Sequence, residues 1–190
     1  NAGVGSISAT PGVTNADGGP CPEGRYCPEG SAAPEVCPLG TFTPLTHRTS
    51  VDDCELCTAG EHCTSVDTTA TAGDCDAGYF CISGSSEAAP VSGQCSVGHY
   101  CPAGSPAELP CLDGTYMNHS LAEVCYDCPV GSYCDNGISP TSCPQGYYCD
   151  EIGLGPDEYS ACPAGTYGDS TGLVSEEECT ECDGGRFCPT

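Results

Sequence analysis

The chain has 190 residues, 20 cysteines and a formal net charge of −24, with only three basic residues. A surface that neutralises nucleic-acid phosphates needs Lys and Arg side chains, so this composition excludes a nucleic-acid-binding protein. Leu, Ile, Val and Phe make up about an eighth of the residues, too few to offset the entropy lost when a chain folds around a core. Because the cysteine content is typical of disulfide scaffolds, we expect cross-links to hold the chain in shape.

Residues 1–20 contain no cysteine and are rich in Gly, Ser, Ala, Thr and Pro. This composition predicts a flexible arm or linker. The alternative is an O-glycosylated segment, or an arm that docks on a neighbouring subunit. We therefore divide the chain into this arm and a cysteine-rich array over residues 21–190, which we expect to continue beyond residue 190.

One phrase recurs ten times in the array: an opening cysteine, two residues, a glycine, one residue, an aromatic residue and then a closing cysteine. The glycine predicts a tight turn with positive φ, and Pro after the opening cysteine suits the first corner of that turn. The ten repeats recur every 15 to 20 residues, which suits one short β-hairpin each. With 26 Gly and 17 Pro, we expect little or no helix. The predicted fold is an elongated array of small disulfide-rich repeats, each in contact mainly with its neighbours.

The ten opening and ten closing cysteines account for all twenty. Disulfides at this density indicate an oxidising compartment, so we expect the protein to be extracellular, either secreted or on the cell surface. Connectivity cannot be read from a sequence; pairing within each repeat is the simplest scheme, and a crossed scheme between neighbouring repeats is its main rival. The simplest scheme pairs Cys21–Cys27, Cys37–Cys54, Cys57–Cys63, Cys75–Cys81, Cys95–Cys101, Cys111–Cys125, Cys128–Cys134, Cys143–Cys149, Cys162–Cys179 and Cys182–Cys188.

Two kinds of metal site are weighed and disfavoured. Three Cys-x-x-Cys pairs have the spacing of zinc ligands, but two cysteines in every repeat favour disulfides over zinc. Acidic clusters lack the ordered ligand spacing of a calcium loop, so a solvated acidic surface is favoured over weakly bound calcium. The pairs are Cys54/Cys57, Cys125/Cys128 and Cys179/Cys182, and the clusters are Asp52-Asp53, Asp74 with Asp76, and Glu176-Glu177-Glu178.

No catalytic or cofactor site is predicted. The four histidines, His47, His62, His99 and His119, show no paired spacing, and we expect each to be solvated or packed. No nucleophile with a base, phosphate-binding loop or cofactor motif is present, so we expect no enzyme.

One modification site is predicted. Asn118-His119-Ser120 is an N-glycosylation sequon in the long loop between Cys111 and Cys125, and we expect Asn118 to carry a glycan. No apolar run is long enough to span a membrane.

The stretch Cys21–Ser31 and the run from Cys162 to Cys182 resemble the ephrin-receptor-like cysteine-rich repeat. The resemblance covers residues 21–190; the module is also similar to tumour-necrosis-factor-receptor and EGF-like modules. His62, at an aromatic position, departs from the pattern. In that family such arrays occur in receptor ectodomains and in surface proteins of protists and algae, and long arrays resemble the subunits of mastigonemes, the hair-like fibres of flagella.

This resemblance implies an extracellular structural glycoprotein, a repeat segment of a cell-surface or secreted fibre subunit. Its partners would be copies of itself or a companion subunit, together with glycans. The alternative is the stalk or ligand-binding region of a cell-surface receptor or adhesin.

Overall fold

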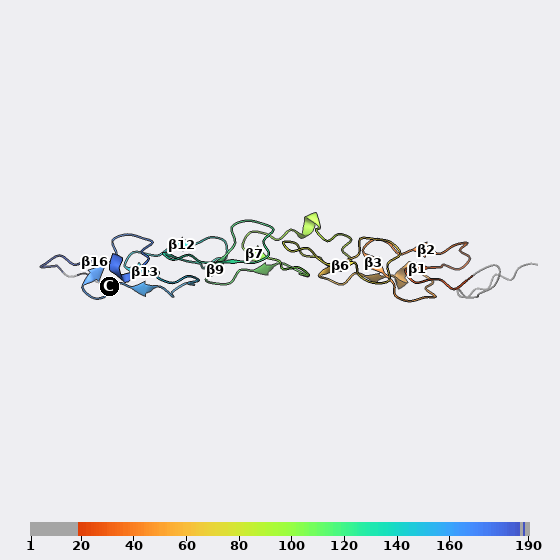
Figure 1. Cartoon of the computed structure of the whole chain (residues 1–190), viewed down its shortest axis with the longest axis horizontal. Coiled ribbons are helices and arrows are strands. Elements are labelled where there is room, and N and C mark those ends of the chain that lie inside the picture. Colours follow the sequence, from red (N-terminus) through yellow and green to blue (C-terminus); the bar gives the residue numbers. More distant parts are fainter. Residues whose placement is uncertain (1–18, 187, 189–190) are drawn as a thin grey trace, which may run out of the picture. The chain divides into compact units, whose positions relative to one another are not determined.

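The computed structural model describes residues 19–186 and 188, so most of the predicted arm lies outside the described residues. The chain forms two compact parts. The first comprises the residues up to Gln94 with Ala103–Ala107, and the second comprises Cys95–Pro102 with the residues from Glu108 onward. In both parts the strands are short arrows separated by loops (Figure 1).

The described residues form eight two-stranded antiparallel sheets, and each sheet follows the same plan. The first strand follows the turn glycine of a repeat, and the second directly precedes the next opening cysteine. The pairs are β1 (Arg25–Tyr26) with β2 (Glu35–Val36), β3 (Thr41–Phe42) with β4 (Glu55–Leu56), β5 (Glu61–His62) with β6 (Gly73–Asp74), β7 (His99–Tyr100) with β8 (Leu109–Pro110), β9 (Thr115–Tyr116) with β10 (Tyr126–Asp127), β11 (Ser132–Tyr133) with β12 (Thr141–Ser142), β13 (Tyr147–Tyr148) with β14 (Ser160–Ala161), and β15 (Thr166–Tyr167) with β16 (Thr180–Glu181).

Repeat 4, which begins at Cys75, has only an isolated bridge between Tyr79 and Gln94 in place of a sheet. Helical structure among the described residues consists of three single 3-10 turns, η1 (Val51–Asp53), η2 (Val91–Gly93) and η3 (Glu176–Glu178). The predicted fold class, disulfide-rich repeats with short hairpins and little helix, is confirmed.

The turn glycine has positive φ in all ten repeats, between 76° and 93°, as its spacing predicts. In repeats 2 to 10 the turn closes with a backbone hydrogen bond, such as that from Thr41 N–H to Pro38 C=O at 3.1 Å. The glycine is therefore the third residue of a β-turn, where a type II turn requires positive φ. The predicted role of Pro is wrong: Pro38 is the first residue of the turn and supplies its carbonyl group, and Leu39 occupies the corner.

The buried core consists largely of the cysteines themselves. Two further clusters lie in the second part. Met117 and Ala122 pack with Cys111, and Tyr100 of the preceding repeat covers them. The other cluster contains Cys143, Cys149 and Leu154, covered by Tyr133 and Tyr159. At Tyr100 and Tyr133, the repeat's aromatic side chain thus packs on the disulfide region of the next repeat.

Candidate functional site

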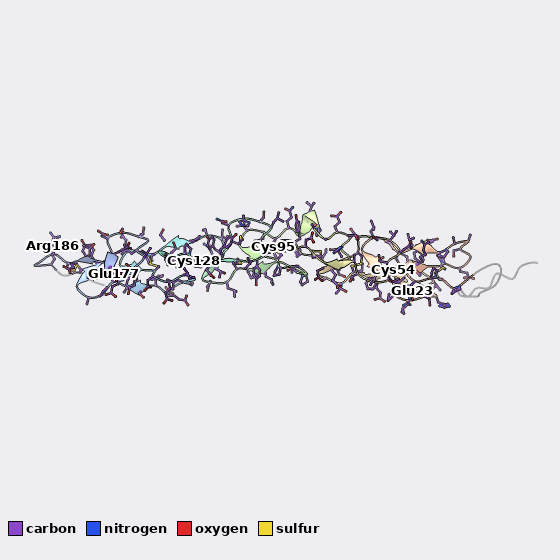
Figure 2. The ribbon with its side chains drawn as sticks, in the orientation of Figure 1. Glu23, Cys54, Cys95, Cys128, Glu177 and Arg186 are labelled. Carbon is purple, nitrogen blue, oxygen red and sulfur yellow. A yellow bond between two sulfur atoms is a disulfide. The ribbon has the colours of Figure 1, made fainter. Side chains whose placement is uncertain are left out.

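Every opening cysteine is joined to the closing cysteine of its own repeat, with Cα–Cα distances of 5.8–6.1 Å. No cysteine is left free in the part of the chain that the structure describes. Each Cys-x-x-Cys pair is divided between two disulfides; for example, Cys54 bonds to Cys37 and Cys57 bonds to Cys63. Figure 2 shows Cys54, Cys95 and Cys128 within the ribbon. Because the disulfides close single repeats, other interactions must join one repeat to the next.

In three repeats, called long here, the closing cysteine follows the opening one by 14 or 17 residues, and another residue fills the buried position that it occupies elsewhere. In short repeats the closing cysteine stands six residues after the opening one. In the long repeats this place is taken by Thr43, Met117 and Gly168, all buried. The displaced closing cysteines, such as Cys54, are only half-buried and lie next to the second strand of the hairpin. Counting six residues from each opening cysteine would have identified this buried position from the sequence.

Adjacent repeats are joined by a recurring set of four backbone hydrogen bonds. Between repeats 7 and 8, Gly131 N–H donates to Cys149 C=O and Cys143 N–H donates to Gly131 C=O, at 2.8 and 2.9 Å. Cys134 N–H donates to Leu154 C=O at 3.0 Å, and Gly153 N–H donates to Cys128 C=O at 2.8 Å. The first joint repeats this pattern with Gly24–Thr43, Cys37–Gly24, Cys27–Arg48 and His47–Cys21. Since backbone groups make these bonds, the joint tolerates varied side chains.

Contacts also reach the repeat after next, beyond the expected contacts between neighbours. The turn glycine of repeat 6, Gly114, lies against a second tight turn in repeat 8. A Cβ atom added at Gly114 would lie 2.2 Å from the carbonyl oxygen of Gly153. Equivalent contacts pair Gly24 with Asp67, Gly40 with Gly84, Gly60 with Gly104, and Gly131 with Gly172. Only glycine permits so close an approach of two backbones.

This second turn has left-handed backbone geometry in repeats 1 to 9, nine or ten residues after the opening cysteine. Glycine often occupies it, but His47, Asp67 and Leu121 have φ of 64°, 62° and 64°. The sequence does not reveal this turn, because Gly, Asp, His and Leu share the position and no single residue type marks it. The joint is the recurring structural element of the chain, since it fixes how one repeat follows another within each part.

The predicted acidic clusters include carboxylates with structural roles. Asp53 accepts hydrogen bonds from the backbone N–H groups of Thr49 and Ser50 at 2.9 and 3.0 Å. These bonds, with a smaller contribution from Arg48 at 3.8 Å, lower the pKa of the Asp53 carboxyl. At η3, Glu178 accepts a hydrogen bond from the Val174 N–H at 2.7 Å. Both carboxylates hold local turns.

The other residues of the predicted acidic clusters, Asp52, Asp74, Asp76, Glu176 and Glu177, are exposed. Glu23 and Glu177, labelled in Figure 2, are both exposed. Asp74 lies in β6, and Asp76 follows the opening cysteine of repeat 4. Among the described residues, no three His, Cys, Asp or Glu side chains are grouped so as to hold a metal ion.

Ser96, His99 and Glu108 form a polar cluster that resembles a catalytic triad only in composition. Ser96 Oγ donates to Glu108 Oε2 at 2.7 Å and lies 3.2 Å from His99 Nδ1. His99 Nε2 is 3.9 Å from Glu108 Oε1. The hydrogen bond from the Ser96 hydroxyl is the main cause of the lowered pKa of the Glu108 carboxyl. The same bond links the turn after Cys95 to the residue that directly precedes β8. In a nucleophilic site the serine hydroxyl would donate to the imidazole, whereas here it donates to Glu108.

Asn118 is exposed, in the loop that follows β9. The other histidines lie apart: His62 Nδ1 is 3.1 Å from the carbonyl oxygen of Asp74, while His47 and His119 are exposed.

No helix within the described ranges has the length and apolar character needed to cross a bilayer. Ten disulfides are consistent with an extracellular protein. The sequence matches no protein-family model and shows no significant similarity to a curated protein.

Proposed function

We propose that this chain is a repeat segment of an extracellular structural fibre, a glycoprotein subunit that acts by its shape and without catalysis. The recurring joint supports this proposal most strongly. The same backbone hydrogen bonds recur between successive repeats within each part, for example in repeats 1–2 and 7–8. An array with one joint geometry adds repeats without changing the contacts, which suits a spacer or a fibre.

The resemblance of residues 21–190 to ephrin-receptor-like repeats, and of long arrays to mastigoneme subunits, favours a fibre over a folded enzyme. The partners proposed are copies of this chain or a companion subunit. With a net charge of −24, bare chains repel one another within the screening distance of about 8 Å at physiological ionic strength. Lateral contact therefore requires glycans, divalent cations or a less acidic partner between the chains.

Electron microscopy of the cells that make this protein, with antibody against residues 21–190, tests the proposal. We expect label at regular intervals along filaments, and co-purification of this chain with itself or one companion. Label confined to the plasma membrane, with a soluble ligand bound to one repeat, would instead support the receptor or adhesin stalk.

The charge argument has its own test on the purified chain. Sedimentation in calcium chloride and in sodium chloride at matched ionic strength separates a specific need for divalent cations from simple screening. We expect faster sedimentation in calcium chloride than in sodium chloride, because a divalent ion bridges carboxylates of two chains. Equal assembly in both salts would show that screening is sufficient, and assembly in neither would point to glycans or a companion subunit.

A further inference from the structure

Three tyrosine rings meet at the joint between repeats 7 and 8. Tyr159 contacts Tyr147 with ring centroids 5.0 Å apart and an interplanar angle of 74°. It also contacts Tyr133, with centroids 5.3 Å apart and an angle of 52°. Tyr147 lies opposite Ala161 in the β13–β14 pair, and Tyr159 is two residues before Ala161. Tyr147 and Tyr159 are therefore diagonal neighbours on one face of the hairpin, within reach for aromatic side chains.

Tyrosine is the main oxidisable side chain that this chain exposes. Oxidants usually attack cysteine thiolates and methionine. The chain has no Trp, and every cysteine that the structure describes is in a disulfide. Its single methionine, Met117, is only 1% exposed. Tyr147 is 37% exposed, so a diffusing oxidant reaches its ring.

The Asp157 carboxylate lies beside Tyr159, the ring that contacts both other tyrosines, and can accept its proton. The Tyr159 hydroxyl donates to Asp157 Oδ1 at 3.4 Å. Burial, together with the charge of Asp157, raises the pKa of the Tyr159 phenol. The ring is therefore a neutral phenol at neutral pH and must release its proton when it loses an electron. The Asp157 carboxylate is placed to accept that proton.

We propose that Tyr159 and Tyr147 form a dityrosine cross-linking site, used when a haem peroxidase acts on this chain with hydrogen peroxide as the oxidant. This modification goes beyond the proposed fibre function and does not depend on it. Each phenol gives up one electron and its hydroxyl proton, and the two radicals join by a carbon–carbon bond between ring positions ortho to the hydroxyls. The hydrogen on each joined carbon then moves through solvent to its phenol oxygen. The product has two hydrogens fewer than the two side chains, and one hydrogen peroxide becomes two water molecules.

Coupling within one chain is favoured over coupling between chains. Two rings held in contact need no diffusion to meet, whereas rings on separate chains do. Chains with a net charge of −24 also repel each other, most strongly at low ionic strength. The cross-link would close the hairpin of repeat 8 with a bond that reductants do not break, unlike the disulfide Cys143–Cys149.

The test treats the oxidised full chain with horseradish peroxidase and limiting hydrogen peroxide at low salt. We expect dityrosine fluorescence in the monomer fraction after size-exclusion chromatography. After reduction and peptic digestion, mass spectrometry should find peptides joined through Tyr147 and Tyr159, two hydrogens lighter than their sum. Raising the salt concentration should increase dimer products, while Tyr147 and Tyr159 should remain the residues joined in the monomer product.

Two variants and a control locate the cross-link. Tyr159→Phe and Tyr147→Phe should each abolish the joined peptide, while alkylation without reductant confirms that the disulfides have formed. Tyr167→Phe is the matched control: Tyr167 is also 37% exposed but has no ring contact among the described residues, so its removal should change nothing in the monomer. The proposal is overturned if Tyr159→Phe keeps the full monomer fluorescence, or if the monomer product joins only Tyr116 and Tyr126, whose rings are 6.1 Å apart.

Discussion

Substituting alanine for the turn glycine should be costly only where another repeat packs against that turn. Gly114 and Gly146 occupy the same place in repeats 6 and 8, with φ of 82° and 87°. A Cβ at Gly114 would lie 2.2 Å from the carbonyl oxygen of Gly153, while nothing lies within 4 Å of a Cβ at Gly146. Gly114→Ala and Gly146→Ala thus share the backbone strain and differ in the contact between repeats.

The two costs follow from this geometry. Left-handed backbone costs alanine about 1–2 kcal/mol, and the lower entropy of the unfolded chain returns about 0.4–1 kcal/mol. We therefore expect Gly146→Ala to lower the free energy of local opening by roughly 1 kcal/mol. At Gly114 the two backbones must also separate by about 1 Å. That movement disrupts the bonds from Gly114 N–H to Cys134 C=O and from Cys128 N–H to Gly114 C=O, which are 2.9 and 2.8 Å long. At about 1 kcal/mol each, their loss brings the total to roughly 3 kcal/mol.

Hydrogen exchange of the oxidised protein measures these local openings, since a repeat array can open in segments. In Gly114→Ala, exchange at the Gly114 and Cys128 amides should quicken by roughly a hundredfold. The Gly146→Ala variant should show less than about tenfold at its own joint. Equal effects of the two substitutions would mean that the contact between repeats 6 and 8 contributes nothing to stability.

Four other outcomes are expected. Thr43 Oγ1 is fully buried with no hydrogen-bond partner among the described residues, so Thr43→Val should raise the unfolding free energy in urea by about 1 kcal/mol; the control Thr43→Ser, which keeps the hydroxyl, should not. The lowered pKa of Asp53 gives stability above the unfolded Asp pKa of about 3.9 that is lost as pH falls through the folded value. The unfolding free energy of Asp53→Asn should thus fall less than that of the unsubstituted protein as pH drops below about 4. The same dependence of unfolding free energy on pH in both proteins would contradict this role of Asp53. Full reduction should expand the hydrodynamic radius, because each bridge contributes about 2–3 kcal/mol, and a compact reduced chain would reveal an overlooked core. Glycopeptide mass spectrometry of native material should find Asn118 modified; a wholly bare Asn118 would contradict its accessibility.

Local features of the fold could be predicted from the sequence. The positive φ of the ten turn glycines follows from their fixed distance to the opening cysteine, because a turn of four residues is specified by its own residues. The short hairpins follow for the same reason. Composition alone indicated cross-links in place of a core, and the buried residues are largely cysteines.

Contacts between repeats could not be predicted in this way. The second turn at His47 and Leu121 is left-handed without glycine, because hydrogen bonds to the preceding repeat hold its backbone. The approach of Gly114 to Gly153 joins residues two repeats apart, and no local pattern encodes that distance. The contact of Tyr147 with Tyr159 depends on the register between β13 and β14. That register could not be read from the sequence, because a long loop separates the two strands.

Mapping the disulfides of the unreduced protein tests whether each repeat is closed by its own cross-link and joined to the next without a covalent side-chain bond. Peptic digestion followed by electron-transfer fragmentation identifies each linked pair. We expect Cys37 to be linked to Cys54 and Cys57 to Cys63, with no link between repeats. A bond between Cys54 and Cys57, or any bond between two repeats, would contradict the joint described above.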